Sequence, residues 1–118
     1  MIKSIAFTVY PVTDMSRSRN FYEGVLGLKV GSNFQDQWVE YDLGDSTFAI
    51  TTMNLGRTPG AKGGIVGFEV TDFDGYTRSL RDKSVTFILD KVETPVCRMA
   101  VVEDPDRNSI TIHKRHTG

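Results

Sequence analysis

Apolar and polar residues change their spacing along the chain in the same order twice. A run rich in apolar and β-branched residues, typical of a strand, covers residues 5–10 and returns at 65–70. The sequence Val-Thr-Asp follows at 12–14 and again at 70–72, and apolar residues then recur at helical spacings of three and four. This repetition predicts two copies of one structural unit.

Each predicted helix begins at an aspartate, Asp14 in the first copy and Asp72 in the second. Its carboxylate can accept hydrogen bonds from the free amides of the first helical turn. Gly27 suits the left-handed position that closes the first helix. Gly75 weakens the second helix by about 1 kcal/mol relative to alanine but does not overturn the prediction.

Three further strands are predicted after each helix, separated by turn-prone residues. They cover 28–33, 37–43 and 47–52 in the first copy, and 85–91, 97–103 and 109–114 in the second. The sequence therefore predicts an α+β fold: one domain over 1–118 built from a βαβββ module at 1–53, a glycine-rich linker at 54–64 and a second βαβββ module at 65–118. Neither module is large enough to bury its own sheet face, so we expect the two to pair.

Composition narrows the class of protein. Hydrophobic residues make up 39% and charged residues 25%, which is the balance of a folded globular domain. The net charge is −1, and basic residues cluster only at 113–116, which argues against a nucleic-acid groove. With a single cysteine and two histidines, the chain has neither an internal disulfide nor zinc-finger spacing. Without an apolar run of 18 residues or a secretion signal, we expect a cytoplasmic protein that does not contact membranes.

Three motifs have a structural interpretation that competes with a functional one. The glycines and lysine at 60–64 lack the order of a phosphate-binding loop, so a linker is favoured. The carboxylates at 104–108 lack the spacing of a calcium loop, and a β-turn explains them. Cys97 is either a nucleophile or, more commonly for a lone cysteine in a strand, a small buried hydrophobe.

Strand alternation separates the last strand into two faces. Ile110 and Ile112 should face the core, which places Thr111 and His113 on the opposite, polar face. His113 is therefore a candidate site residue or a half-exposed structural histidine. Two aromatic residues of the third strand, Trp38 and Tyr41, pack in the core or line a pocket.

Motifs along the whole chain resemble the vicinal oxygen chelate superfamily, which includes glyoxalase I, bleomycin-resistance proteins and extradiol dioxygenases. The residues that carry the resemblance are Val12-Thr13-Asp14-Met15-Ser16-Arg17-Ser18, Phe21-Tyr22, Leu26-Gly27-Leu28 and Asp104-Pro105-Asp106-x-Asn108. The resemblance implies paired βαβββ modules whose curled mixed sheets form a cup. In the metal enzymes of this family, side chains in that cup hold one divalent ion.

The positions that the resemblance assigns to metal ligands hold unsuitable residues. They map to Phe7 and Ile65 on the first strands, and to Thr111 and Thr51 (or Ala49) on the last strands. A divalent ion of this kind requires imidazole or carboxylate ligands. No metal ligand and no cofactor is therefore predicted, and the resemblance to the metal-free bleomycin-resistance branch implies a protein that binds an organic small molecule, as a homodimer. The predicted ligand-binding residues are Phe7, Val9, Trp38, Thr51, Ile65, Cys97, Thr111 and His113.

Two enzymatic alternatives stay open. One is a metal-independent lyase or isomerase that uses Glu69 and His113 as an acid–base pair, because both project to the same predicted face. The other is a metal-dependent lyase or dioxygenase with atypical ligands, for instance Glu40, Glu69 and His113. The identity of the ligand does not follow from the sequence.

Overall fold

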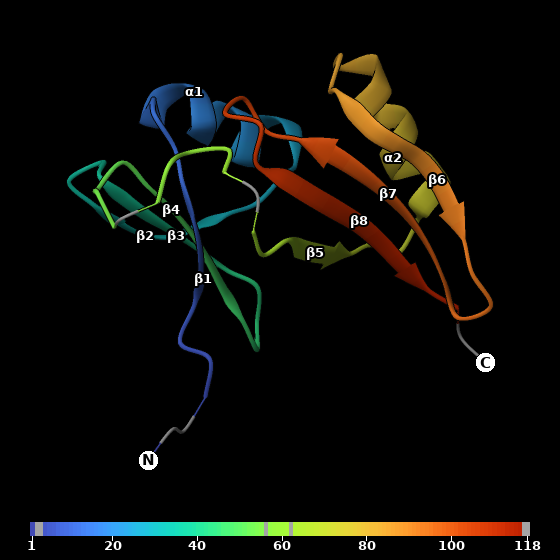
Figure 1. Cartoon of the computed structure of the whole chain (residues 1–118), viewed down its shortest axis with the longest axis horizontal. Coiled ribbons are helices and arrows are strands. Elements are labelled where there is room, and N and C mark those ends of the chain that lie inside the picture. Colours follow the sequence, from blue (N-terminus) through green and yellow to red (C-terminus); the bar gives the residue numbers. More distant parts are fainter. Residues whose placement is uncertain (2–3, 56, 62, 117–118) are drawn as a thin grey trace. The chain divides into compact units, whose positions relative to one another are not determined.

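The computed structural model describes residues 1, 4–55, 57–61 and 63–116, and the chain divides into two compact units, Met1–Ala61 and Lys62–Gly118. Within the described residues, each unit has the order strand, helix, three strands, and its four strands form one sheet (Figure 1). The predicted α+β fold with two βαβββ modules is therefore confirmed.

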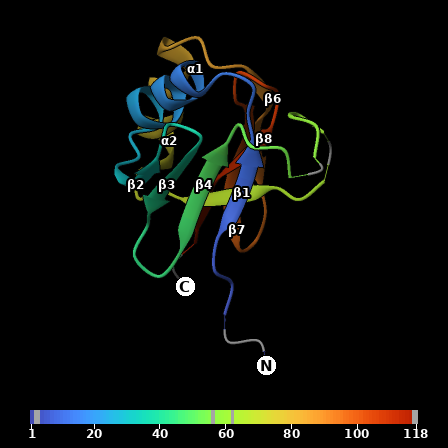
Figure 2. The same ribbon diagram turned by 90° about the vertical axis from the view of Figure 1, so that its left-hand side faces the viewer.

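The first unit forms a mixed sheet. Its elements are β1 (Thr8–Pro11), α1 (Met15–Arg19), the π-helical segment η1 (Asn20–Val25), β2 (Val30–Phe34), β3 (Trp38–Asp42) and β4 (Thr47–Thr51). The strand order is β1-β4-β3-β2. Figure 2 shows β1 and β4 side by side and pointing the same way, whereas the other neighbouring strands are antiparallel.

The second unit repeats this topology. Its elements are β5 (Val66–Glu69), α2 (Phe73–Asp82), β6 (Phe87–Glu93), β7 (Cys97–Glu103) and β8 (Ser109–Arg115). The strand order is β5-β8-β7-β6, with β5 parallel to β8 and the other pairs antiparallel.

Each sheet buries one face against its own helix. In the first unit the ring of Tyr22 lies 5.3 Å from Phe48 and 6.2 Å from Tyr41, centroid to centroid. In the second unit Ile110 and Ile112 are fully buried, as the alternation of β8 predicts. Residues between these core positions point to the other side of the sheet. We call that side the open face of the first or of the second sheet.

The predicted helix caps are confirmed. Asp14 Oδ1 accepts from the Arg17 amide at 3.0 Å, and Asp72 Oδ1 accepts from the Gly75 amide at 3.0 Å. Gly75 has a specific reason to lack a side chain, because a Cβ there would lie 2.2 Å from Asp72 Oδ2. Gly27 has the expected left-handed conformation, with φ of 84°.

The first helix differs from the single α-helix that the sequence predicts. Only Met15–Arg19 is α-helical, and Asn20–Val25 forms a π-helix. The Leu26 amide accordingly donates to the Phe21 carbonyl, an i→i+5 bond of 2.9 Å. A hydrophobic pattern over six residues is too short to distinguish these two helical periods.

Some strand ends also differ from the prediction. The first strand begins at Thr8 and not at Ile5, whose side chain is exposed. Thr8 pairs with Phe48, the second residue of β4, so β1 does not extend beyond the neighbouring strand that supplies its hydrogen bonds. The described part of the linker at 54–64 contains neither helix nor strand, and Gly56 and Lys62 lie outside the described residues. In the part of the chain that the structure describes, no helix has the length and apolar character needed to span a membrane.

Candidate functional site

An aromatic group lies on the open face of the first sheet. The rings of Phe7 and Trp38 meet edge to face, with centroids 5.0 Å apart and an interplanar angle of 84°. Trp38 pairs with Thr51 across β3 and β4, and Val9 pairs with Ala49 across β1 and β4, so these side chains share the open face. The structure therefore brings together the four residues that the sequence singles out in this unit.

Glu40 and Phe34 extend this aromatic group. The Trp38 indole Nε1–H donates to Glu40 Oε2 at 2.9 Å, which restricts the orientation of the indole. Phe34 pairs with Trp38 across β2 and β3 and is 60% exposed. The sequence did not identify Phe34 as a site residue, although its alternation with Ser32 places it on this face. The open face thus combines exposed aromatic area with the carboxylate of Glu40.

The hydroxyl group of Thr51 is hydrogen-bonded to the backbone. The side chain is fully buried, its hydroxyl donates to the Gln37 carbonyl at 2.7 Å, and it accepts from the Met53 amide at 3.0 Å. Thr51 therefore has no free hydroxyl to offer a ligand. It lies opposite Trp38 on the neighbouring strand and supports that side chain by position.

Glu69 and His113 form a hydrogen-bonded pair on the open face of the second sheet. They are directly opposite on β5 and β8, and His113 Nδ1 lies 2.5 Å from Glu69 Oε1. The other oxygen of Glu69 accepts from the Arg115 amide at 2.7 Å. These two hydrogen bonds hold the pKa of Glu69 below its usual value. The bond from the Arg115 amide has the larger effect, and the bond with His113 has the next largest. Neither side chain is buried, so a bound molecule could reach the pair.

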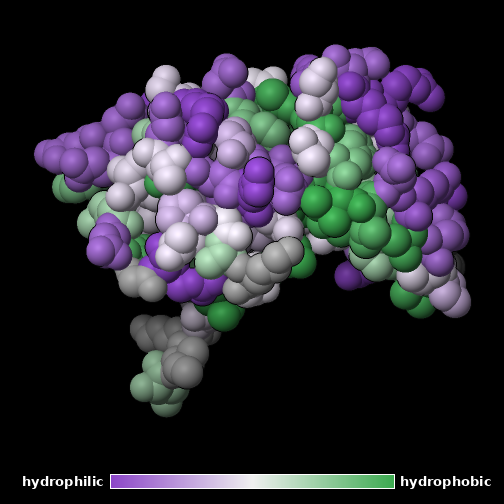
Figure 3. Space-filling view, turned by 45° about the horizontal axis from the view of Figure 1, so that its top comes forward, coloured by the Kyte–Doolittle hydropathy of each residue, from purple (hydrophilic) through white to green (hydrophobic). Residues whose placement is uncertain are grey.

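The remaining predicted residues of the second unit are arranged differently. Thr111 pairs with Val101 and Gly67 and shares the open face with His113. Cys97 also falls on this face by register, but it is buried, with Sγ 3.2 Å from Thr94 Oγ1. Ile65 precedes β5 and is 57% exposed. Figure 3 shows hydrophobic side chains gathered on the second unit among largely hydrophilic neighbours.

The residues at the family's metal positions do not fit a divalent ion. Phe7 and Ile65 have no donor atoms, and the Thr51 hydroxyl is bonded to the backbone. Over residues 1, 4–55, 57–61 and 63–116 there is no group of three or more His, Cys, Asp or Glu side chains that could hold a metal. Glu40 is hydrogen-bonded to Trp38. These residues therefore supply no set of ligands for a catalytic metal ion.

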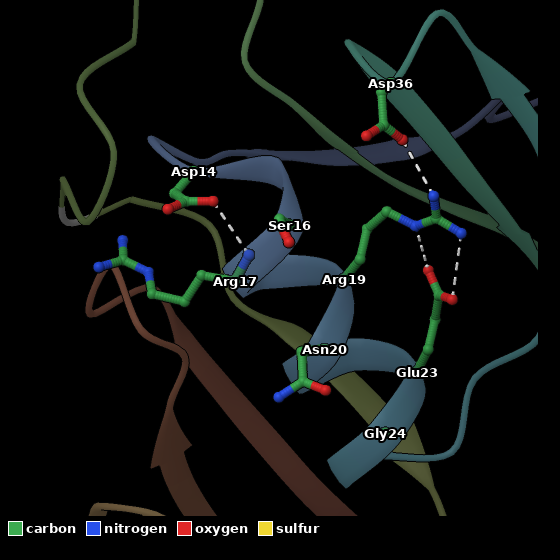
Figure 4. A pocket seen from close by; sticks show the side chains of 8 residues that line it. All are labelled: Asp14, Ser16, Arg17, Arg19, Asn20, Glu23, Gly24 and Asp36. Atoms are coloured by element: carbon green, nitrogen blue, oxygen red, sulfur yellow. Dashed lines mark hydrogen bonds and ion pairs between the residues drawn. The ribbon is translucent and has the colours of Figure 1, made fainter.

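A polar hollow of about 610 Å³ lies beside α1 and η1 (Figure 4). Arg19 forms ion pairs across it, at 2.7 Å with Glu23 and at 2.9 Å with Asp36, and the buried Tyr41 hydroxyl donates to Glu23 at 2.9 Å. Hydrogen bonds from Asn33 and Arg19 lower the pKa of Asp36, and burial raises the pKa of Tyr41. Arg19 is thus paired with both carboxylates, and these ion pairs connect the helix to the β2–β3 turn. The hollow is therefore explained by a structural role.

Comparison with known proteins agrees with this fold. The family model described as Glyoxalase/Bleomycin resistance protein/Dioxygenase superfamily matches residues 4–112. No curated protein matches the chain significantly. Among solved structures, the chain is similar to TnmS3, an antibiotic-binding protein from a Streptomyces species, with 21% identity, 98% of each chain covered and a TM-score of 0.84.

Two further structures show the range of proteins that share the fold. A glyoxalase/bleomycin resistance protein/dioxygenase from Alicyclobacillus acidocaldarius has 15% identity over 97% of this chain and 92% of its own, with a TM-score of 0.74. A lactoylglutathione lyase from Agrobacterium tumefaciens has 19% identity over 96% of this chain and 94% of its own, with a TM-score of 0.75. At such identities the likeness supports the fold and does not select a function.

Proposed function

Because the chain belongs to the glyoxalase/bleomycin resistance protein/dioxygenase superfamily, we propose that it binds a small organic molecule on the open face of the first sheet, without a catalytic metal. The observation that carries this proposal is the edge-to-face contact of Phe7 with Trp38, two aromatic side chains that are not buried in the core. Aromatic rings offer large apolar area with few rotatable bonds, which suits binding.

The neighbours of the aromatic pair support the same function. Glu40 fixes the Trp38 indole, so less side-chain freedom is lost when a ligand packs against it. Phe34 supplies a third ring on the same face. The structural likeness to an antibiotic-binding protein also favours an organic ligand for this chain. A planar, partly apolar molecule is the class of ligand that matches this surface.

A thermal-shift screen of aromatic and amphipathic compounds tests the proposal. A ligand present at 100 times its Kd stabilises a protein by about 2.7 kcal/mol, which raises the Tm of a chain of this length by several degrees. The account predicts concentration-dependent shifts that persist in the presence of a chelator. A broad screen without any shift, or shifts that a chelator abolishes, would contradict it.

A second candidate function rests on the hydrogen bond between Glu69 and His113. The lowered pKa of Glu69 keeps its carboxylate ionised near neutral pH, so it accepts and His113 Nδ1–H donates. The lone pair on Nε2 is then available to accept a proton, the arrangement of an oriented general base. This geometry favours a metal-independent lyase or isomerase.

Product analysis separates the two functions. Compounds found in the screen are incubated with the wild-type protein and with His113→Gln, and their masses and isomeric composition are compared. Conversion by the wild-type protein that is lost in His113→Gln, with binding retained, supports an enzyme. Recovery of every bound compound unchanged rejects the acid–base role and leaves the binding function.

The homodimer, the cytoplasmic location and the absence of nucleic-acid binding remain predictions. The exposed edge strand β6, with Ile88 51% and Leu89 48% exposed, supports self-association, because edge strands carry unpaired backbone groups. Sedimentation analysis tests the dimer directly. A single monomeric species at micromolar concentration would contradict it.

A further inference from the structure

Glu40 is a half-buried carboxylate on the open face of the first sheet. It lies on β3, between β2 and β4 (Figure 2), opposite Ser32 on one neighbour and Ala49 on the other, and neither neighbour carries a charge. Within the described residues Glu40 forms no ion pair, and its hydrogen bond is the one that Oε2 accepts from the Trp38 indole. Its negative charge is therefore not balanced by the sheet that holds it.

The charges of the whole first sheet have the same sign. Its strands β1, β2, β3 and β4 contain no lysine, arginine or histidine. They contain two carboxylates, Glu40 and Asp42, and alternation along β3 places both on the open face. Asp42 Oδ1 accepts from the Gly44 amide at 3.0 Å, which leaves the carboxylate charged. This face therefore attracts a cation and repels an anion.

The hydrogen bond from Trp38 places an aromatic ring beside the charge of Glu40. Because Trp38 Nε1 lies 2.9 Å from Glu40 Oε2, a cationic group that contacts the carboxylate can also lie within about 6 Å of the indole centroid, the range of a cation–π attraction. Tryptophan gives the strongest attraction of this kind among the aromatic side chains. Phe7, with its ring centroid 5.0 Å from that of Trp38, adds apolar area for the rest of a ligand.

We propose that the ligand of the first sheet is an organic cation, with Glu40 accepting hydrogen bonds from its positive group and Trp38 packing against that group. This inference rests on the binding function proposed above and adds the charge of the ligand. An amidinium or guanidinium group matches the site best, because its parallel N–H groups fit the two oxygens of a carboxylate. Each carboxylate oxygen can accept two hydrogen bonds, so Oε2 can accept from the ligand as well as from Trp38.

Three planar molecules of nearly the same shape test the charge preference. At neutral pH benzamidine is a cation, benzamide is neutral and benzoate is an anion. Trp38 is the single tryptophan, so its indole N–H gives one identifiable NMR signal in the full-length chain. Each probe is titrated into the millimolar range, since a fragment of this size binds with a Kd of about 1 mM. The proposal predicts a saturable shift with benzamidine and binding about tenfold weaker with benzamide, which lacks the ion pair and the cation–π attraction.

The outcomes separate this inference from the binding function on which it rests. Benzamide that binds as tightly as benzamidine overturns the charge preference and leaves the binding function in place. Tighter binding of benzoate, or no saturable shift with benzamidine, also overturns the preference. The binding function itself is rejected by the thermal-shift screen, which includes neutral and charged compounds alike.

A variant of Glu40 isolates the role of its charge. Glu40→Gln keeps a side-chain oxygen that can accept from the Trp38 indole. Its affinity for benzamidine should fall about tenfold, and its affinity for benzamide should equal that of the wild-type protein. Asp45→Asn removes the same charge from the exposed β3–β4 turn and should leave both affinities nearly unchanged. Equal weakening of both probes in Glu40→Gln would show that Glu40 only positions the indole and would overturn the proposal.

Salt dependence gives a second readout on the wild-type protein, which does not depend on the stability of a variant. Salt screens partly exposed charges, so the affinity for benzamidine should fall when sodium chloride is raised from about 0.05 M to about 0.5 M. The affinity for benzamide should stay constant over the same range. Equal salt dependence of the two probes would contradict an ion pair with Glu40.

Discussion

Glu69 and His113 are 44 residues apart in the chain and face each other across two parallel strands, with Oε1 and Nδ1 2.5 Å apart. The amide of Arg115, two residues beyond His113, holds the second oxygen of Glu69. The pair depends on the register of β5 and β8, because a slip of one residue would move one partner to the opposite face. Both oxygens of the Glu69 carboxylate are thus held by residues of the neighbouring strand β8.

Replacing Glu69 should change how stability depends on pH. The pKa of Glu69 is lowered on folding from its usual 4.5, so its contribution is fully present above about pH 4.5 and is lost as pH falls through the lower folded value. Glu69→Gln should therefore be less stable than the wild-type protein at pH 6, and the two should converge as the pH falls through the lowered pKa of Glu69. Urea unfolding at several pH values measures the difference. Glu103→Gln, which removes a carboxylate from β7, serves as the control.

Removing the ring of Phe7 should weaken ligand binding more than it affects folding. Phe7 is 42% exposed and contacts Trp38 on the open face. An aromatic contact contributes about 1 kcal/mol, so Phe7→Ala should lower affinity by roughly fivefold for a ligand found in the screen. Leu43→Ala is the matched control, because Leu43 is 43% exposed in the same unit. Equal affinities for the two variants would place the ligand elsewhere.

Removing the hydroxyl of Tyr41 should destabilise the first unit. Tyr41 is fully buried and donates to Glu23 at 2.9 Å. A hydrogen bond to a charged group contributes about 1.5 kcal/mol, and Tyr41→Phe should lose that amount in chemical denaturation. In the Glu23→Gln background the cost should be smaller, since the acceptor is then neutral. A cost that is the same in both backgrounds would show that the charge of Glu23 does not strengthen the hydrogen bond.

Alanine at position 75 should fail to stabilise α2 despite its higher helix propensity. Its Cβ would collide with the Asp72 carboxylate and displace the N-cap. The loss of the cap, about 1 kcal/mol, then offsets the gain in propensity. In an Asp72→Ala background the collision is absent, and Gly75→Ala should stabilise by about 1 kcal/mol. Thermal unfolding of the four proteins checks this, and a similar gain in both backgrounds would reject the explanation.

Sequence motifs predicted the helix ends correctly because each end depends on hydrogen bonds and backbone angles within a few residues. Asp14, Asp72 and Gly27 mark helix ends through hydrogen bonds and backbone angles of their own neighbourhood. The shared face of Glu69 and His113 follows from strand alternation together with the repeated topology. The same alternation separates Trp38 on the open face from Tyr41 in the core, but the sequence alone did not say which of them faces the helix.

Phe34 shows where sequence signals were insufficient. The β2–β3 turn contains Gln35 and Asp36, both with positive φ, and lacks the glycine that usually marks such a turn. In the sequence, Asn33 is the turn-prone residue at this place, and the predicted strand therefore ends there, one residue before Phe34. The side chain of Asn33 and the ion pair from Arg19 hold Asp36 in this conformation, and these contacts require the folded unit.

The most direct test of the binding function is a fluorescence titration of chelator-treated protein with a compound from the screen. Trp38 is the single tryptophan of the chain, so its emission reports on the open face of the first sheet. The account predicts a saturable change in emission with one ligand per chain, weakened in Phe7→Ala and unaffected by added divalent metal. Binding that leaves Trp38 emission unchanged, or that appears only after metal is restored, would contradict it.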